Sequence, residues 1–216
     1  VPDERGMAAE FDPGQFIQVQ VPGTDTLRAY SLANCGNWDG VFELFVRIQP
    51  SGLFSTWLST RAAVGDTLTI RGPQGAFGIH ESGLRPRWFI GGGTGIAPML
   101  SMVRRMAEWG DPQPVRLYFG VNTVAEVFAR SAVAQLGGAL ADFTATVCVW
   151  HPEAGMPWGG FVGTPVDALI RDLADVTEWP DVYVCGPPAM ADAVDRALAA
   201  AGVPVDQIRT ERFTAS

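Results

Sequence analysis

The chain has 216 residues, of which 47% are hydrophobic and 18% charged, a composition typical of a globular protein. Its net charge of −8 argues against non-specific binding to nucleic acid or an anionic membrane, and its 15 basic residues are all arginine, which excludes lysine Schiff-base chemistry. Because no apolar run could span a bilayer and no secretory signal begins at Val1, we expect a cytoplasmic protein.

Cysteine and histidine are scarce and widely spaced. Cys35, Cys148 and Cys185 form no C-x-x-C pair, which predicts reduced thiols without a disulfide framework. His80 and His151 have no ligand-like spacing to each other or to the cysteines, so we expect no protein-bound metal. His151, just before a proline, is interpreted as a loop residue rather than a base.

The first 80 or so residues are predicted to form strands and turns. Alternation of apolar and polar residues predicts strands at 16–21, 41–48 and 67–70, and Pro-Gly or Gly-Pro pairs predict turns at 13–14, 22–23 and 72–73. One helix is expected at 53–62. Residues 1–10 show no clear strand, and 11–16 resemble the entry to an inner strand. We predict a small antiparallel β-barrel whose first strand is missing from this chain.

From residue 87 onward strands and helices alternate. Strands are predicted at 87–91, 115–120, 143–150, 181–185 and 207–213, and helices at 96–109, 124–136, 165–173 and 189–201. This alternation predicts a doubly wound parallel sheet covered by helices on both faces. The boundary falls near 83–86, so we expect a β-barrel domain at 1–84 and an α/β domain at 85–216.

A glycine-rich turn joins the first predicted strand of the second domain to its first helix, and its residues are Gly91, Gly92, Gly93, Thr94 and Gly95. Free N–H groups and the positive end of the helix dipole can bind a pyrophosphate, and glycines let the backbone approach closely. The turn fits neither G-x-G-x-x-G nor a P-loop. A purely structural tight turn is therefore an alternative.

In the first domain, a cation and an aromatic ring share one face of a predicted strand. Arg28 and Tyr30 are two residues apart, a pairing that suits an anionic cofactor with a flat ring system, and Ser31 adds a hydroxyl. Downstream, Ser55 near the start of the predicted helix is either an N-cap or part of a second phosphate cradle. Together with the glycine-rich turn of the second domain, this gives two candidate phosphate-binding turns, which imply two nucleotides.

Four ordered motifs resemble those of the ferredoxin–NADP reductase superfamily across nearly the whole chain. They are R-x-Y-S at 28–31, G-x-x-S-x-x-L at 52–58, G-G-G-T-G-x-A-P at 91–98 and C-G-P-P-x-M at 185–190. Within the superfamily, 11–16, 118–123, 148–152 and 211–213 look most like the reductase components of soluble methane, propane and related hydrocarbon monooxygenases.

The resemblance implies that the first domain binds FAD. Arg28 would neutralise the FAD pyrophosphate, Tyr30 would cover part of the isoalloxazine, and Ser31 would hydrogen-bond flavin N5, the atom that receives hydride. Further phosphate contacts would come from Gly52, Ser55 and Thr56.

The resemblance also implies that the second domain binds NADH. Its pyrophosphate would lie on the glycine turn around Thr94, and Pro98, Gly186 and Pro187 belong to the same motifs. Cys185 and Glu211 would act with Ser31 as catalytic residues by placing nicotinamide C4 at ~3–3.5 Å from N5, and Phe213 would cover the flavin. Alternatively, Cys185 is a buried hydrophobe, Phe213 ordinary core, and Glu211 an ion-pair partner of Arg209 or Arg212.

The coenzyme and the electron acceptor are predicted from what the sequence lacks. After the second parallel strand, 121–126 carry no base before Arg130, which favours NADH over NADPH. The C-x4-C-x2-C spacing of a plant-type [2Fe–2S] domain is also absent, so we expect the FAD and NADH part of a longer reductase. Electrons would pass to a [2Fe–2S] domain and then a di-iron hydroxylase. The alternatives are an aromatic-ring dioxygenase, a haem protein, free flavin, or an FAD-binding electron-transfer subunit without turnover.

Overall fold

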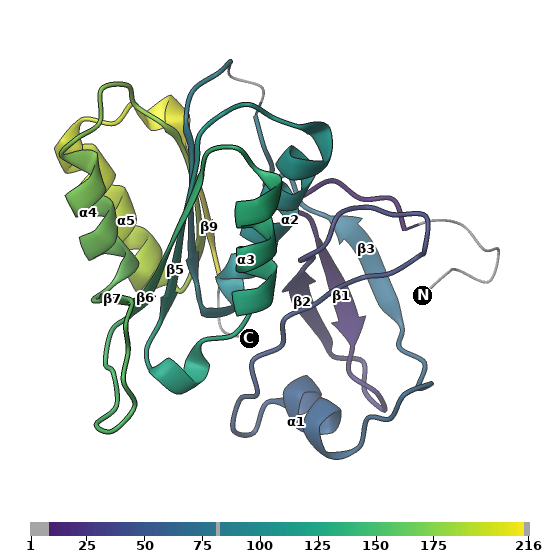
Figure 1. The fold of residues 1–216 in the computed structure, drawn as a ribbon. Helices are drawn as coiled ribbons and strands as arrows, with labels where there is room; N and C mark the ends of the chain where they lie inside the picture. Colours follow the sequence, from purple (N-terminus) through teal and green to yellow (C-terminus); the bar gives the residue numbers. More distant parts are fainter. Residues whose placement is uncertain (1–8, 81–82, 214–216) are drawn as a thin grey trace.

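The computed structural model describes residues 9–80 and 83–213, which form two neighbouring sheets (Figure 1). The first is antiparallel with strand order β2-β1-β3, and the second has six parallel strands in the order β7-β6-β5-β4-β8-β9. This arrangement confirms the predicted combination of an antiparallel and a doubly wound parallel half. Within the described ranges, no helix combines the length and apolarity needed to cross a membrane. The prediction of no strand at the start of the chain lies, up to residue 8, outside the described residues.

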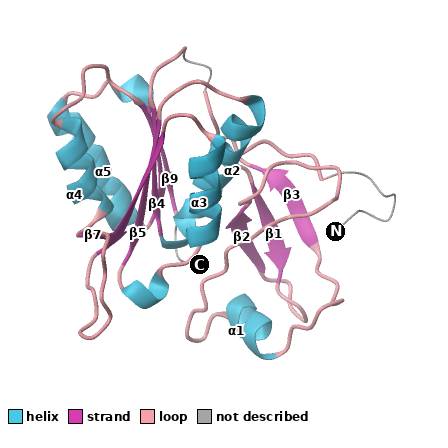
Figure 2. Cartoon of the chain, viewed as in Figure 1, coloured by secondary structure: helices cyan, strands magenta, loops and turns pink. Residues whose placement is uncertain are grey.

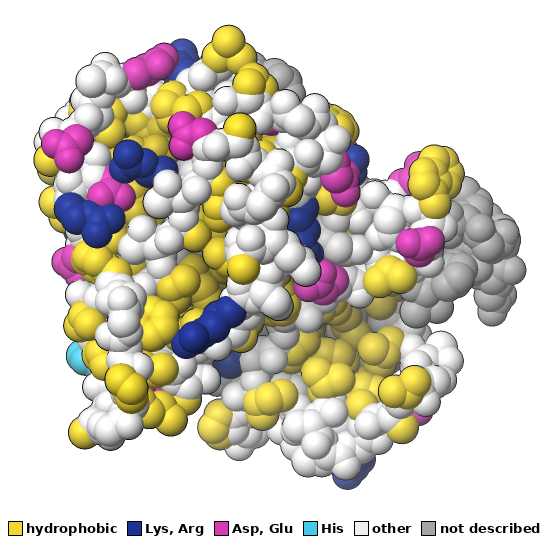
Figure 3. Space-filling model, in the orientation of Figure 1, with side chains coloured by type: hydrophobic (Ala, Val, Ile, Leu, Met, Phe, Trp, Pro, Cys, Tyr) yellow, Lys and Arg dark blue, Asp and Glu magenta, His cyan; other side chains and the backbone are white. Residues whose placement is uncertain are grey.

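The antiparallel half consists of three strands and one helix. They are β1 (Phe16–Gln20), β2 (Leu27–Ser31), α1 (Leu53–Thr60) and β3 (Ile70–Gln74). Alternation along β1 turns Ile17 and Val19 into the core, where α1 adds the buried ring of Phe54. Figure 3 shows apolar side chains gathered in the hollow of this half above α1.

The closed barrel is only partly realised in the described residues. The prediction of a strand at 41–48 is wrong. This segment makes only one bridge among the described residues, from Leu44 to Leu32, because no described strand pairs along its length. Its apolar alternation is real, since Phe42, Leu44 and Val46 pack against the core. The turn predicted at 72–73 instead lies inside β3, whose Pro73 is tolerated because β3 is an edge strand.

The parallel half alternates strands with helices as predicted. Its strands are β4 (Arg87–Gly92), β5 (Val115–Val121), β6 (Phe143–Val149), β7 (Phe161–Val162), β8 (Asp181–Gly186) and β9 (Ile208–Arg212). Its helices are α2 (Ile96–Trp109), α3 (Arg130–Ala139), α4 (Pro165–Leu173) and α5 (Pro188–Ala201), with short 3-10 turns η1 (Gly93–Gly95), η2 (Val124–Glu126) and η3 (Val205–Gln207). Helices α2 and α3 cover one face and α4 and α5 the other (Figure 2).

One predicted helix is wrong in its extent. Instead of a single helix at 124–136, the chain forms η2, and α3 begins only at Arg130. The break is local, because Val127 has an extended backbone and Ala129 a left-handed one, with φ of 57°, directly before α3. The two-residue strand β7 was not predicted.

The strand order places a binding crevice without reference to any motif. From β4 the chain builds β5 and β6 on one side and returns to build β8 and β9 on the other. In open α/β sheets, ligands bind beyond the carboxyl ends of the strands where the order reverses. In this chain that point lies between Gly92 at the end of β4 and Gly186 at the end of β8.

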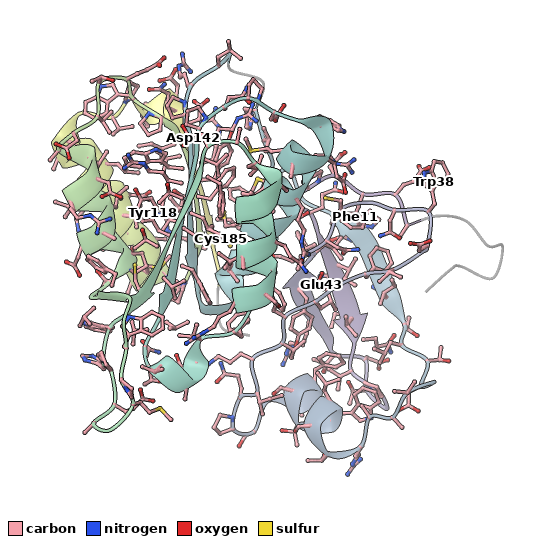
Figure 4. All side chains as sticks on the ribbon, in the orientation of Figure 1. Phe11, Trp38, Glu43, Tyr118, Asp142 and Cys185 are labelled. Atoms are coloured by element: carbon pink, nitrogen blue, oxygen red, sulfur yellow. The ribbon has the colours of Figure 1, made fainter. Side chains whose placement is uncertain are left out.

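Helix α2 fastens the two halves together. Ser101 Oγ donates to Asn34 O at 2.7 Å, and the Arg104 guanidinium donates to Ala33 O and to Glu43 Oε2, both at 2.7 Å. Figure 4 shows Glu43 at this junction. The packing fixes the start of the second half against the segment that follows β2.

Candidate functional site

A cleft of about 740 Å³ lies between the two halves, at the carboxyl ends of the parallel strands. Its volume falls within the range of small-molecule sites, roughly 300–1,000 Å³. Both halves contribute site residues predicted from the sequence, namely Arg28, Tyr30, Ser31, Gly52, Ser55, Thr94, Glu211 and Phe213. The other predicted residues do not line this cleft: Thr56, Gly91, Gly92, Gly93, Gly95, Pro98, Cys185, Gly186 and Pro187.

The β2 wall of the cleft is cationic and aromatic. Arg28 and Tyr30 both line it, and the Tyr30 ring packs on Phe54 with 5.4 Å between centroids. Burial raises the pKa of the Tyr30 phenol, and the neighbouring Arg28 charge partly opposes this effect. In the described part of the chain no carboxylate pairs with Arg28, whose guanidinium donates to Leu27 O at 3.0 Å. This cation is therefore available to an anionic ligand.

The start of α1 and the loop before it form a compact turn beside the cleft. Gly52 is the N-cap, so the alternative of a Ser55 N-cap is wrong. Ser55 instead closes the preceding loop: its Oγ accepts from Gln49 N at 3.1 Å and lies 3.3 Å from Gly52 O. A Cβ on Gly52 would come within 2.6 Å of Ser55 Oγ. The first amides of α1 have no intrahelical acceptor, and residues 53–55 line the cleft. Thr56 N is already bonded to Gly52 O.

The glycine turn has a steric reason for most of its glycines. A Cβ on Gly91 would lie 2.7 Å from Ile96 Cα, one on Gly92 2.5 Å from Met190 Sδ, and one on Gly95 2.3 Å from Cys185 O. The alternative of a tight structural turn therefore accounts for these three positions. Of the turn residues, Thr94 faces the cleft. The turn thus packs β4 against β8 and α5 and places Thr94 on the wall of the cleft.

A buried thiol and a half-buried, cleft-lining carboxyl group form a pair on adjacent strands. Cys185 and Glu211 are register partners, and Cys185 Sγ donates to Glu211 Oε2 at 3.6 Å. Burial raises the pKa of Glu211 while the thiol hydrogen bond lowers it, and burial and the Glu211 charge hold the pKa of Cys185 well above its ordinary value. Figure 4 shows Cys185 within the parallel sheet. Glu211 pairs with neither Arg209 nor Arg212, so that alternative is wrong.

Phe213 lies where both of its predicted interpretations place it, whereas Cys185 lies where the buried-hydrophobe interpretation places it. Phe213 lines the cleft and also packs on the core, and its N–H donates to Gly186 O at 3.0 Å. Cys185 is fully buried in that same core.

Two cleft arginines were missed by sequence reasoning. Arg47 forms an ion pair with Glu126 at 2.9 Å across the two halves, and Arg212 pairs with Asp192 and Asp195. The sequence offered one signal for both arginines: each lies in a segment where apolar and polar residues alternate. Their partners lie 79 and about 20 residues away, beyond any spacing rule.

The carboxyl end of β5 is acidic. Glu126 Oε2 accepts from Asn122 N at 3.0 Å, and Glu153 Oε2 accepts from Val124 N at 2.8 Å. Arg130, the nearest base along the chain, places its guanidinium over the Trp158 ring at 5.3 Å. A ribose diol suits such an edge better than a 2′-phosphate.

Comparison with known proteins gives two family matches and a consistent set of relatives. Residues 89–196 match the model of the oxidoreductase NAD-binding domain, and residues 4–79 match the oxidoreductase FAD-binding domain. The reductase component of propane 2-monooxygenase from Rhodococcus jostii is 37% identical over 208 residues, which cover 95% of this chain and 56% of the relative. The electron transfer component of toluate 1,2-dioxygenase from Pseudomonas putida is 34% identical over 206 residues, covering 95% and 60%.

A solved structure agrees with these matches. The Amycolatopsis cytochrome P450 reductase GcoB superimposes with a TM-score of 0.87 at 31% identity, covering 95% of this chain and 62% of that one. The chain therefore spans between one half and two thirds of the length of these relatives.

Proposed function

The chain belongs to the family of oxidoreductases that join an FAD-binding to an NAD-binding domain, and we propose that it transfers hydride from NADH to FAD as part of an oxygenase reductase. We assign FAD binding to residues 1–84 and NADH binding to 85–216. Support for this division comes from the two separate sheets and from the two family matches at 4–79 and 89–196.

One observation carries the proposal: a single cleft collects predicted groups from both halves. The FAD-binding half contributes Arg28, Ser31 and the start of α1, and the NAD-binding half contributes Thr94, Glu211 and Phe213. The donor set fits a flavin dinucleotide, because Arg28 has no acidic partner among the described residues and the first amides of α1, beside the cleft, have no intrahelical acceptor. When bound, FAD supplies the chemistry that accepts hydride and releases single electrons.

The protein's own groups have distinct proposed roles. Arg28 and the free α1 amides neutralise and hold phosphate. Ser31 and Thr94 offer hydroxyls on opposite walls of the cleft, and Phe213 shields its inner end from water. Cys185 and Glu211 supply a thiol–carboxyl pair that orients the carboxamide of the nicotinamide. Glu211 accepts from the Cys185 thiol through Oε2, and its other oxygen can accept from the carboxamide N–H.

We propose NADH as the coenzyme and a [2Fe–2S] domain, followed by a di-iron monooxygenase hydroxylase, as the electron acceptor. The acidic end of β5, where Arg47 is already paired with Glu126, supports NADH. The propane 2-monooxygenase reductase component supports the acceptor. Similarity to the toluate 1,2-dioxygenase component favours a second candidate, service to an aromatic-ring dioxygenase.

Anaerobic mixing of the FAD-loaded chain with NADH tests the reductase proposal. The yellow colour should bleach with NADH and far more slowly with equimolar NADPH. A loaded protein that stays yellow would refute the proposal. Ser31→Ala should slow bleaching more than it raises the NADH concentration for half-maximal rate, whereas Ser59→Ala on the exposed side of α1 should leave both unchanged.

Acceptor choice is tested separately. The NADH-reduced chain is mixed with isolated [2Fe–2S] domains of a propane monooxygenase reductase and of a toluate dioxygenase component. Faster cluster reduction with the first supports the monooxygenase assignment, and faster reduction with the second supports the alternative.

A further inference from the structure

The edge strand β9 is fastened to α5 by carboxylates. Asp195 on α5 uses both of its oxygens: Oδ1 accepts from the Thr210 hydroxyl at 2.8 Å and Oδ2 from the Arg212 guanidinium at 2.6 Å. Asp192, one turn earlier, accepts from Arg212 Nε at 3.0 Å. We propose that Asp195 is a positioning residue that directs Glu211 and Phe213 toward the cleft. The inference rests on the proposed reductase function.

The carboxylates of Asp192 and Asp195 on α5, with their partners Thr210 and Arg212 on β9, form a clamp. Strand geometry links this clamp to Glu211. Successive side chains of a strand point to opposite faces, so Thr210 and Arg212 share one face and Glu211 takes the other. Holding the first two against α5 therefore turns Glu211 to the opposite face, where Cys185 Sγ lies 3.6 Å from Oε2. Asp195 neither lines the cleft nor bonds to Glu211, so it acts through its two partners on β9, Thr210 and the cleft-lining Arg212.

The backbone ladder alone leaves β9 open to slippage. The strand has five residues and a single neighbour, β8. A slip of one residue would bring Thr210 or Arg212 opposite Cys185 and turn Glu211 toward α5. There its carboxylate would meet Asp192 and Asp195, two like charges. The same pair that attracts Arg212 thus disfavours the wrong register.

Helix α5 is a suitable reference for this alignment because its first turn contacts the cofactor end of the sheet. Met190 packs so closely on Gly92 and Gly186 that a Cβ on either would lie within 2.7 Å of its side chain. Phe213 N donates to Gly186 O at 3.0 Å. The clamp therefore sets the end of β9 relative to the glycine turn.

The side chains of the clamp are partly exposed, so its effect on the position of β9 can be measured apart from any effect on the stability of the fold. The side chains of Arg212 and Asp195 are 43% and 32% exposed, and ion pairs at such sites contribute little to stability. Loss of Asp195 should therefore leave the fold intact and still displace Glu211. A displacement of about 1 Å at a reacting centre can cost up to about 100-fold in rate.

The test compares Asp195→Ala and Asp195→Glu with Asp206→Asn, which removes one exposed charge near β9. In the FAD-loaded chain, Asp195→Ala should slow NADH-driven bleaching at saturating NADH by about tenfold or more, with FAD content and melting temperature unchanged. Asp195→Glu should recover part of the rate. Asp206→Asn should match the wild type.

A second readout does not depend on turnover. Hydrogen exchange of the Phe213 amide and of β9 should accelerate about tenfold in Asp195→Ala, with or without FAD, and not in Asp206→Asn. Wild-type exchange and wild-type bleaching in Asp195→Ala would overturn the inference, as would equal slowing in both variants. If wild-type protein is not bleached by NADH, the reductase proposal fails, while the exchange measurement still tests the clamp.

Discussion

Gly95→Ala is the sharpest perturbation of the glycine turn, with Gly93→Ala as its matched control. A Cβ on Gly95 would lie 2.3 Å from Cys185 O and 2.7 Å from Cys185 C, both backbone atoms of β8. A Cβ on Gly93 would meet no atom within 4 Å, although the φ of +55° there is unfavourable for alanine. The two variants thus separate a steric effect from a conformational one within the same turn.

The expected magnitudes follow from these contacts. The Cβ of Gly95→Ala falls about 1 Å short of an ordinary contact, and β8 cannot retreat because it is paired to β4 and β9 on both sides. Overpacking of this kind costs about 1–3 kcal/mol, and we expect the upper end. Gly93→Ala should cost about 1 kcal/mol for its left-handed backbone. For a chain of this size, about 3 kcal/mol corresponds to a fall in Tm of roughly 6–12 °C, and about 1 kcal/mol to 2–4 °C.

The assay is urea and thermal unfolding of both variants, followed by NADH-driven bleaching of the FAD-loaded proteins. Moving the Cys185 carbonyl also moves the strand end that carries the Cys185–Glu211 pair, so Gly95→Ala should bleach at least about tenfold more slowly. Equal stability of the two variants would refute the steric account of the turn. Equal bleaching rates would separate the turn from the proposed chemistry.

Three further predictions concern the rest of the chain. Thr164→Ala removes the N-cap that accepts from Asp167 N at the start of α4, and should lower the free energy of unfolding by about 1 kcal/mol in urea. Hydrogen bonds from Thr164 lower the pKa of Asp167. The Asp167 carboxylate therefore stabilises the fold above the ordinary carboxyl pKa of about 3.9, and this contribution is lost as pH falls through the lowered pKa. Asp167→Asn should make the free energy of unfolding less dependent on pH in this acidic range. Burial raises the pKa of Cys35 and Cys148 to about 12, so few thiolates exist at pH 8. A disulfide reagent at pH 8 should then label no thiol in the native chain and three after denaturation, and rapid native labelling would contradict this.

The parallel half was predictable because its strands are continuous apolar runs separated by helical periodicity. The strand predicted at 87–91 is β4 at Arg87–Gly92, and the helix predicted at 96–109 is α2 with the same bounds. The failure at 124–136 arises between η2 and α3, where Val127 is extended and Ala129 is left-handed while the apolar pattern continues. Periodicity records which side chains are buried and does not record such local changes of backbone conformation.

The antiparallel half was less predictable because a strand needs a neighbour. Segment 41–48 has strand-like alternation and buries Phe42, Leu44 and Val46 partly, yet it makes one bridge only. Pairing is a long-range property, whereas alternation is local. The same limit applies in the cleft, where motifs predicted Arg28 and Thr94 but not Arg47, whose ion pair with Glu126 spans 79 residues.

Helix α2 links the glycine turn to the segment that follows β2. This helix begins at Ile96, directly after the glycine turn, and its middle bonds to the segment that follows Ser31 through Ser101 and Arg104. A helix has a fixed rise of 1.5 Å per residue, so the turn and the end of β2 are held at a set distance. The relative placement of a flavin on β2 and a pyrophosphate on the turn then depends on this interface. On the proposed function, this interface would align the two cofactors, and the Asp195 clamp would set the side chains at the end of β9.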